Sequence, residues 1–246
     1  MPAVLLESPD NPLVKELLRL HDTRGRREAG RLVVEGRRAI DGCLAAGWHP
    51  VVLLVRQGED IPPTWPEVRA MSPRVAARLS QASTPSGYLA AFALPDPGPV
   101  DPAAGGVVLA DVADPGNTGT LIRTAAALGL RQVVCLGGAD PWSSKVVQST
   151  AGALPLVRVW TPPIAEGLTG LAGGAPRTAL VVHGGSHPRS LAPGPRWVVV
   201  GGEARGIPDA WLAQCDERLT LPMPGGTESL NAAVAGSIAA YLVAMA

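Results

Sequence analysis

The segment from Val107 to Gly129 constrains the fold of this chain most, because a buried strand runs directly into a glycine-rich turn and then a helix. The turn reads Pro115-Gly-Asn-Thr-Gly, and Asn117 or the threonine after it can cap a helix beginning near residue 118. Arg123 then lies about one turn into an otherwise apolar helix, where an unpaired guanidinium is costly. Phosphate or carboxylate is its natural partner. The segment therefore predicts a nucleotide-related site at the carboxyl edge of a parallel sheet.

Downstream of this segment, apolar strand patterns continue to alternate with helical patterns. Strands are expected near 107–111, 132–136, 156–159, 178–182, 197–201 and 217–221. Helices are expected near 118–128, 144–152, 163–172, 208–214 and 229–244. Strands that are apolar throughout and separated by helices indicate an α/β fold with a mostly parallel sheet covered on both faces.

The first third of the chain has the pattern of a separate small α/β unit. Helices are expected over 11–20, 37–46 and 73–80, and strands over 31–35, 51–55 and 88–94. Four prolines and three glycines between Pro95 and Gly106 then indicate a linker. The expected organisation is a first domain over 1–95, a linker over 96–106 and a second domain over 107–246.

Composition excludes several classes of protein. No apolar run is long enough to span a membrane, and the N-terminus has no secretory signal pattern. The three cysteines are widely spaced, which favours a reduced, cytoplasmic protein and no metal site. The chain has no G-x-G-x-x-G after its first downstream strand and no P-loop, so a Rossmann-type cofactor fold is disfavoured.

Charge is balanced overall but unevenly distributed. Residues 1–95 hold 12 Lys and Arg against 10 Asp and Glu, whereas the formal net charge of the whole chain is zero. Arginines gather in the first domain, among them Arg24, Arg26, Arg27 and Arg37. By itself this pattern indicates only a basic, compact α/β unit.

Three segments together resemble the motifs of the SpoU/TrmH family of RNA 2′-O-ribose methyltransferases, in the SPOUT superfamily. The first contains Asp114, Pro115, Asn117, Gly119, Arg123, Ala125 and Gly129. The second contains Gly201, Glu203 and Gly206, and the third Pro222, Met223, Gly225, Ser229, Leu230, Asn231 and Ala235. Ser8 to Leu17 and Arg31 to Ile40 resemble the family's RNA-binding N-terminal domain. The resemblance also implies a trefoil knot in the last third of the chain.

The resemblance implies a set of site residues. S-adenosylmethionine would bind at His183, Gly201, Gly202, Leu221, Met223 and Leu230. The reaction would involve Arg123, Asn117, Glu203, Ser229 and Asn231. RNA would contact Arg24, Arg26, Arg27, Arg37 and Lys145.

Several of these residues have simpler interpretations. Arg123 could be a structural ion-pair partner of Asp111, Asp114 or Glu203. For the Glu203 carboxylate Arg123 is the favoured partner, with Arg205 as its competitor. Ser229 could cap the last helix, and the apolar residues could be ordinary core. Lys145 could be a solvated surface residue, and His183 a loop residue.

The function that these patterns favour is transfer of a methyl group from S-adenosylmethionine to a ribose 2′-hydroxyl of RNA, with ribosomal RNA favoured as substrate. The family resemblance implies a homodimer, and Leu230, Val234, Ile238, Tyr241 and Leu242 form a stripe suited to an interface or a core. The alternatives are a methyltransferase for transfer RNA and a non-catalytic RNA-binding protein of the same fold.

Overall fold

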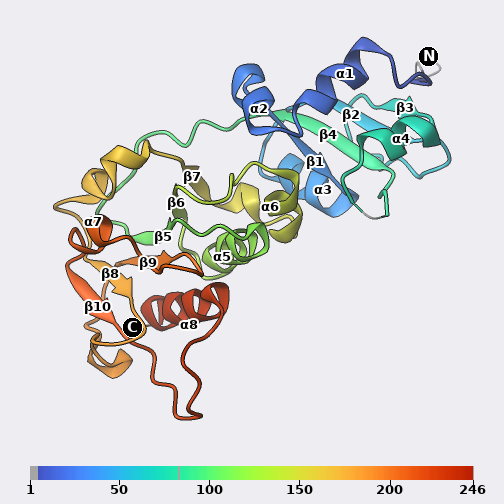
Figure 1. The fold of residues 1–246 in the computed structure, drawn as a ribbon. Coiled ribbons are helices and arrows are strands. Elements are labelled where there is room, and N and C mark those ends of the chain that lie inside the picture. The colour runs from blue at the N-terminus through green and yellow to red at the C-terminus, as the bar shows by residue number, and fades with distance from the viewer. Residues whose placement is uncertain (1–4, 83, 246) are drawn as a thin grey trace. The chain divides into compact units, whose positions relative to one another are not determined.

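The computed structural model describes residues 5–82 and 84–245 and divides into two compact units (Figure 1). The first unit contains Met1–Asp96 and Trp142–Pro155, and the second contains Pro97–Pro141 and Leu156–Ala246. The sequence did not indicate that residues 142–155 group with the first unit. The boundaries expected for the two domains stay a prediction.

The first unit is built on a four-stranded mixed sheet in the order β1-β4-β2-β3. β4 pairs antiparallel with both β1 and β2, and β3 runs parallel to β2. The strands are β1 (Arg31–Glu35), β2 (Pro50–Arg56), β3 (Arg69–Met71) and β4 (Tyr88–Ala93). The helices are α1 (Pro12–Arg19), α2 (Thr23–Ala29), α3 (Arg37–Ala45), α4 (Pro73–Leu79) and α6 (Ser144–Ser149). All six expected elements are confirmed, whereas α2 and β3 were missed.

The core of the first unit lies between α1, α4 and the sheet. Leu17 of α1 and Leu79 of α4 are buried in one apolar cluster with Leu54 of β2. Each helix begins where its sequence allows, because Asn11 accepts a hydrogen bond from Leu13 N at 2.9 Å and Ser72 one from Val75 N at 3.2 Å.

The second unit is built on a six-stranded sheet in the order β10-β8-β9-β5-β6-β7, and every neighbouring pair is parallel. The strands are β5 (Gly106–Ala110), β6 (Gln132–Leu136), β7 (Arg158–Trp160), β8 (Arg177–Leu180), β9 (Trp197–Gly201) and β10 (Glu217–Leu219). The helices are α5 (Pro115–Ala127), α7 (Asp209–Leu212) and α8 (Ala232–Ala244). The expected parallel α/β architecture is confirmed.

Both faces of this sheet are covered. α5 and α8 pack together on one face, where Gly236 permits close approach, since a Cβ there would lie 2.6 Å from Leu121 Cδ2. On the other face Leu171 and Trp211 join an apolar cluster with Val108 of β5. The helix expected over 163–172 is wrong, because this glycine-interrupted segment forms only two short 3₁₀ turns, Ile164–Glu166 and Thr169–Leu171.

The segment read as a linker is held against the second unit by hydrogen bonds. The Trp160 indole donates to Gly98 O at 2.8 Å, and the Trp197 indole donates to Pro102 O at 2.9 Å. Gln132 Nε2 donates to Gly105 O at 3.0 Å. Residues 98–105 are therefore anchored and do not form a free tether. Within the described ranges, the chain has no helix long and apolar enough to cross a membrane.

Candidate active site

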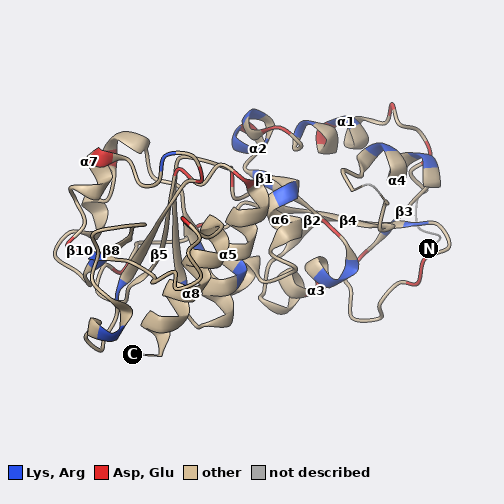
Figure 2. Ribbon diagram, turned by 60° about the horizontal axis from the view of Figure 1, so that its bottom comes forward, with Lys and Arg blue, Asp and Glu red and all other residues tan. Residues whose placement is uncertain are grey.

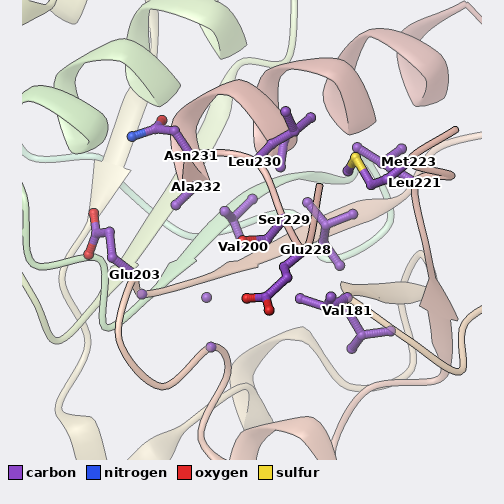
Figure 3. A pocket seen from close by; sticks show the side chains of 16 residues that line it. Val181, Val200, Glu203, Leu221, Met223, Glu228, Ser229, Leu230, Asn231 and Ala232 are labelled. Atoms are coloured by element: carbon purple, nitrogen blue, oxygen red, sulfur yellow. The ribbon is translucent and has the colours of Figure 1, made fainter. Parts of the chain in front are cut away.

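Most predicted site residues of the second unit lie in loops that follow β8, β9 and β10, whereas Asn117 and Arg123 lie in α5, which follows β5. Because parallel strands end at one edge of the sheet, these loops meet there. The segments after β8, β9 and β10 enclose a cavity of about 440 Å³, within the range of small-molecule sites (Figure 3). Five of the six residues expected to bind the methyl donor line it, namely Gly201, Gly202, Leu221, Met223 and Leu230. His183 is exposed and follows Val182, which does line it.

The cavity has apolar and polar sections. Val181, Leu221, Met223 and Leu230 form an apolar wall, which suits a flat aromatic ring (Figure 3). Glu203, Glu228, Ser229 and Asn231 provide the polar lining. The sequence reasoning missed Glu228 and Val181. Glu228 adjoins Ser229 inside the third motif, so its position was the available signal.

A chain of hydrogen bonds joins the three motif segments. Asn117 Nδ2 donates to Glu203 Oε1 at 2.6 Å, and Asn231 Nδ2 donates to Asn117 Oδ1 at 3.1 Å. Ala113 N donates to the second carboxylate oxygen of Glu203 at 3.3 Å. Residues far apart in the sequence are thereby fixed beside the cavity. We refer to Glu203, Asn117 and Asn231 as the amide bridge.

The charge of Glu203 is stabilised by these contacts. Burial acts to raise its pKa, but hydrogen bonds from the Asn117 side chain and from nearby backbone N–H groups outweigh it. The resulting pKa lies below the ordinary value for glutamate, so Glu203 is ionised at neutral pH.

The partners expected for Glu203 are wrong. The sequence favoured an ion pair with Arg123, or else with Arg205, but the carboxylate bonds to Asn117 and to the backbone. Arg123 is the ninth residue of α5, more than two turns from its start. It is exposed, does not line the cavity, and the described part of the chain offers it no ion pair.

Arg123 lies farther from the start of α5 than expected because this helix begins earlier than the sequence indicated. Asp114 caps it, accepting a hydrogen bond from Asn117 N at 2.7 Å, so the supposed turn is the first turn of the helix. Pro115 suits this position because its fixed φ matches the helix and its missing N–H is not needed there. Asn117 is thereby free to use its side chain in the amide bridge.

The cap of α8 also differs from the expectation. Ser229 was a candidate, but Asn231 Oδ1 accepts hydrogen bonds from Ala233 N at 2.9 Å and Val234 N at 3.2 Å. α8 therefore starts at Ala232, three residues later than expected. Ser229 stays in the loop, exposed and on the cavity wall.

Glycines let the loop after β9 pass close to its neighbours. A Cβ on Gly202 would lie 2.2 Å from Asp111 O, and one on Gly201 would lie 2.3 Å from Gly206 C. Both contacts are with backbone atoms, so no side-chain adjustment could relieve them. Asp111 itself has a φ of 59°, which is uncommon for a residue with a side chain.

The residues expected to contact RNA are in differing environments. Arg27 and Lys145 are exposed, Arg24 is exposed and 2.6 Å from Glu28, and Arg37 is 3.9 Å from Asp41. Arg26 is only 3% exposed, and it donates to Leu20 O at 2.8 Å and to Thr23 Oγ1 at 3.0 Å. Its guanidinium holds α2 against the end of α1, which corrects the expectation of a surface RNA contact.

The sequence reasoning also overlooked basic residues on α4. Arg74 and Arg78 are one turn apart on this helix, and both are exposed. Lys and Arg occur along α1, α2 and α4 of the first unit (Figure 2). No group of three or more His, Cys, Asp and Glu able to hold a metal ion occurs within residues 5–82 and 84–245.

Comparison with known families gives two matches. Residues 106–241 match the SpoU rRNA methylase family. Residues 11–90 match an MRM3-like substrate-binding domain.

Individual relatives match over nearly the whole chain. The 23S rRNA (guanosine(2553)-2'-O)-methyltransferase RlmP of Bacillus subtilis is 32% identical over 96% of this chain and 97% of its own. The 23S rRNA (uridine(2479)-2'-O)-methyltransferase of Streptomyces viridochromogenes is 30% identical over 88% of this chain and 83% of its own. The crystal structure of the SpoU methyltransferase AviRb from that organism, in complex with the cofactor AdoMet, matches with a TM-score of 0.84 and 25% identity. It covers 96% of this chain and 97% of its own.

Proposed function

The chain belongs to the SpoU rRNA methylase family, and we propose that it methylates ribosomal RNA at a ribose 2′-hydroxyl beside the amide bridge. It is an RNA 2′-O-methyltransferase that uses S-adenosylmethionine. The observation that carries the assignment of the site is the meeting of the three motif segments beside one cavity, where Glu203 and Asn231 line the cavity and Asn117 bridges them by hydrogen bonds.

The cavity fits the methyl donor in size and chemistry. Its apolar wall suits the adenine, and its carboxylates suit a sulfonium cation. When bound there, S-adenosylmethionine supplies the methyl group. Leu221, Met223 and Leu230 would hold the adenine, with Gly201 and Gly202 keeping the β9 loop close by.

The residues of the amide bridge position the site. Glu203 accepts hydrogen bonds at both carboxylate oxygens and so fixes the loop after β9 against the start of α5. Asn231 ties the start of α8 to the same point. Holding these loops in one geometry lowers the entropy cost of aligning the ribose hydroxyl with the methyl donor.

Arg123 is the candidate for binding the RNA phosphate and stabilising negative charge on the reacting oxygen. A guanidinium is a poor base because its pKa lies above about 12. Its suitable role is electrostatic, as a planar cation beside the developing charge. Arg123 is exposed and lies outside the cavity of its own chain, which supports an active site shared between two subunits.

A homodimer is supported by the surface of α8. Val234, Ile238 and Tyr241 are 48%, 41% and 55% exposed and lie along one side of the helix. The opposite side, with Ala233, Gly236 and Ala240, is buried. An apolar stripe of this kind is typical of an interface.

Because the substrate is ribosomal RNA and the three cysteines are free, we place the protein in the cytoplasm.

The substrate assignment is tested by mapping ribose methylation. Total RNA from cells with and without the gene should differ at one nucleotide of ribosomal RNA. The purified protein should then restore that methyl group on RNA from the deletion strain. A difference confined to transfer RNA would identify transfer RNA as the substrate in place of ribosomal RNA. No difference at all would contradict the proposed activity.

A further inference from the structure

The cavity has an uneven distribution of charge. Glu203 and Glu228 are its two charged lining residues, and its described lining includes no lysine, arginine or histidine. Walls that are largely apolar reduce screening by water, so charges on such a wall act over longer distances than charges in bulk solvent. The cavity therefore favours a ligand with a net positive charge.

The two carboxylates differ in their partners. Both oxygens of Glu203 accept hydrogen bonds from the chain. The described residues provide Glu228 with no ion pair and no side-chain hydrogen bond, and its carboxylate points into the cavity, on the side of Val181 (Figure 3). Glu228 is therefore the carboxylate whose charge is available to a ligand.

The methyl donor and the product of the reaction differ in charge. S-adenosylmethionine carries a sulfonium, an ammonium and a carboxylate, so its net charge is positive. Transfer of the methyl group leaves S-adenosylhomocysteine, which has a neutral thioether and no net charge. The two molecules share the adenine, the ribose and the amino-acid groups, so hydrogen bonds to those groups cannot distinguish them.

We propose that Glu228 is a specificity-determining residue, whose carboxylate makes the cavity bind the charged donor in preference to the uncharged product. This inference rests on the proposed function, since it takes the cavity to be the donor site. Its consequence is that the product, once formed, loses an attraction that the donor had. The cavity then exchanges product for donor more readily.

Calorimetric titration of the purified protein with each compound tests the proposal without any RNA. Glu228→Gln should weaken binding of S-adenosylmethionine about tenfold, the effect of one charge pair in partly screened surroundings. Binding of S-adenosylhomocysteine should change less than about twofold. Glu228→Asp should keep the preference of the wild type. Raising the salt concentration should reduce that preference in the wild type more than in Glu228→Gln.

Glu166→Gln is the matched control, because Glu166 is exposed in the same unit, does not line the cavity, and gives the same change in net charge. Equal weakening of both compounds by Glu228→Gln would overturn the proposal, since the carboxylate would then bind the shared ammonium or ribose. Unchanged binding of both would overturn it as well. If the wild type binds neither compound, the result contradicts the proposed function itself and not only the role of Glu228. Thermal melting checks the folding of each variant, and Glu228→Ser replaces Glu228→Gln if that variant does not fold.

Discussion

At the scale of single residues, Asn231 combines a structural and a functional contact through its two amide atoms. Its oxygen caps α8 through Ala233 N and Val234 N, and its nitrogen donates to Asn117 Oδ1. If residue 231 lost its donor, Asn117 could not flip its amide to compensate, because its own nitrogen donates to Glu203. The two contacts can therefore be separated by substitution.

Asn231→Asp should keep the cap and break the amide bridge, since a carboxylate accepts hydrogen bonds but cannot donate one. We expect the free energy of unfolding to stay within about 0.5 kcal/mol of the wild type and methyl transfer to fall at least about tenfold. Asn231→Ala should lose both, with about 1 kcal/mol of stability. Thermal melting and single-turnover methylation measure the two effects. Equal rates in Asn231→Asp and wild type would refute a role for the bridge in the reaction.

Arg123 is the residue on which the reaction should depend most. Arg123→Ala removes one preorganised cation and should lower the single-turnover rate about 10²–10³-fold. Arg123→Lys should restore little, because a point charge does not replace a planar fork. Arg123 is exposed and has no ion pair within residues 5–82 and 84–245, so we expect the melting temperature and the donor affinity of these variants to be unchanged. A variant that methylates at nearly the wild-type rate would exclude this role.

At the scale of elements, the edge strand β10 depends on an ion pair at its start. Asp216 accepts two hydrogen bonds at 2.9 Å from the Arg177 guanidinium, and a third from Arg177 N at 2.8 Å. These bonds lower the pKa of Asp216 to about 2. Because the pKa is lower in the folded state than the unfolded value of about 3.9, this stabilisation is complete above about pH 4 and is lost as the pH falls towards 2.

Asp216→Asn should remove that part of the acid sensitivity. The side chain of Asp216 is 45% exposed, so solvent screening reduces the expected loss of stability at pH 7 to about 1 kcal/mol. Urea unfolding at pH 7 and at pH 2.5 provides the measurement. The difference between variant and wild type should shrink at the lower pH. A difference that is the same at both values would mean that Asp216 is not ionised in the way its contacts indicate.

The helices α2 and α4 carry the basic residues best placed to meet RNA phosphates. Arg27 and Arg78 are exposed and have no ion-pair partner among the described residues. The double variant Arg27→Ala, Arg78→Ala should weaken RNA binding and reduce the salt slope by about 2, one for each lost phosphate contact. Donor affinity should not change. Filter binding over a series of salt concentrations provides the test, and an unchanged slope would identify these arginines as solvated surface only.

The sequence predicted long elements well and their ends poorly. Strands such as β5 and β9 are buried on both faces, so their apolar runs are unambiguous. The start of α5 was misplaced because Pro115 and Gly116 suggest a turn, and only the contact from Asn117 N to Asp114 identifies a cap. Motif residues predicted half of the cavity wall, eight of its sixteen lining residues. The partner of Glu203 was beyond sequence reasoning, because it depends on where three separate loops meet.

At the scale of the whole molecule, two observations concern a second subunit. Arg123 lies outside the cavity of its own chain, and α8 presents an exposed apolar stripe. A homodimer would cover Val234, Ile238 and Tyr241 and could bring Arg123 of one chain to the cavity of the other. Ile238→Glu should therefore give a monomer in sedimentation analysis, because a charge cannot be buried in an apolar interface without a partner.

The trefoil knot implied by the family resemblance stays a prediction.

Mixing two variants of reduced activity decides whether the active site is shared. Arg123→Ala provides an intact cavity without the arginine, and Asn231→Ala provides the arginine with a damaged cavity. If Arg123 serves the partner subunit, a mixed dimer holds one complete site, and random mixing restores about a quarter of wild-type activity by mass action. If Arg123 serves its own chain, each site in the mixed dimer lacks one residue and no activity returns. Each variant mixed with itself is the control, and exchange of subunits is verified with differently tagged chains. Failure to recover activity in verified mixed dimers would place Arg123 at the site of its own chain and remove the reason for a shared active site.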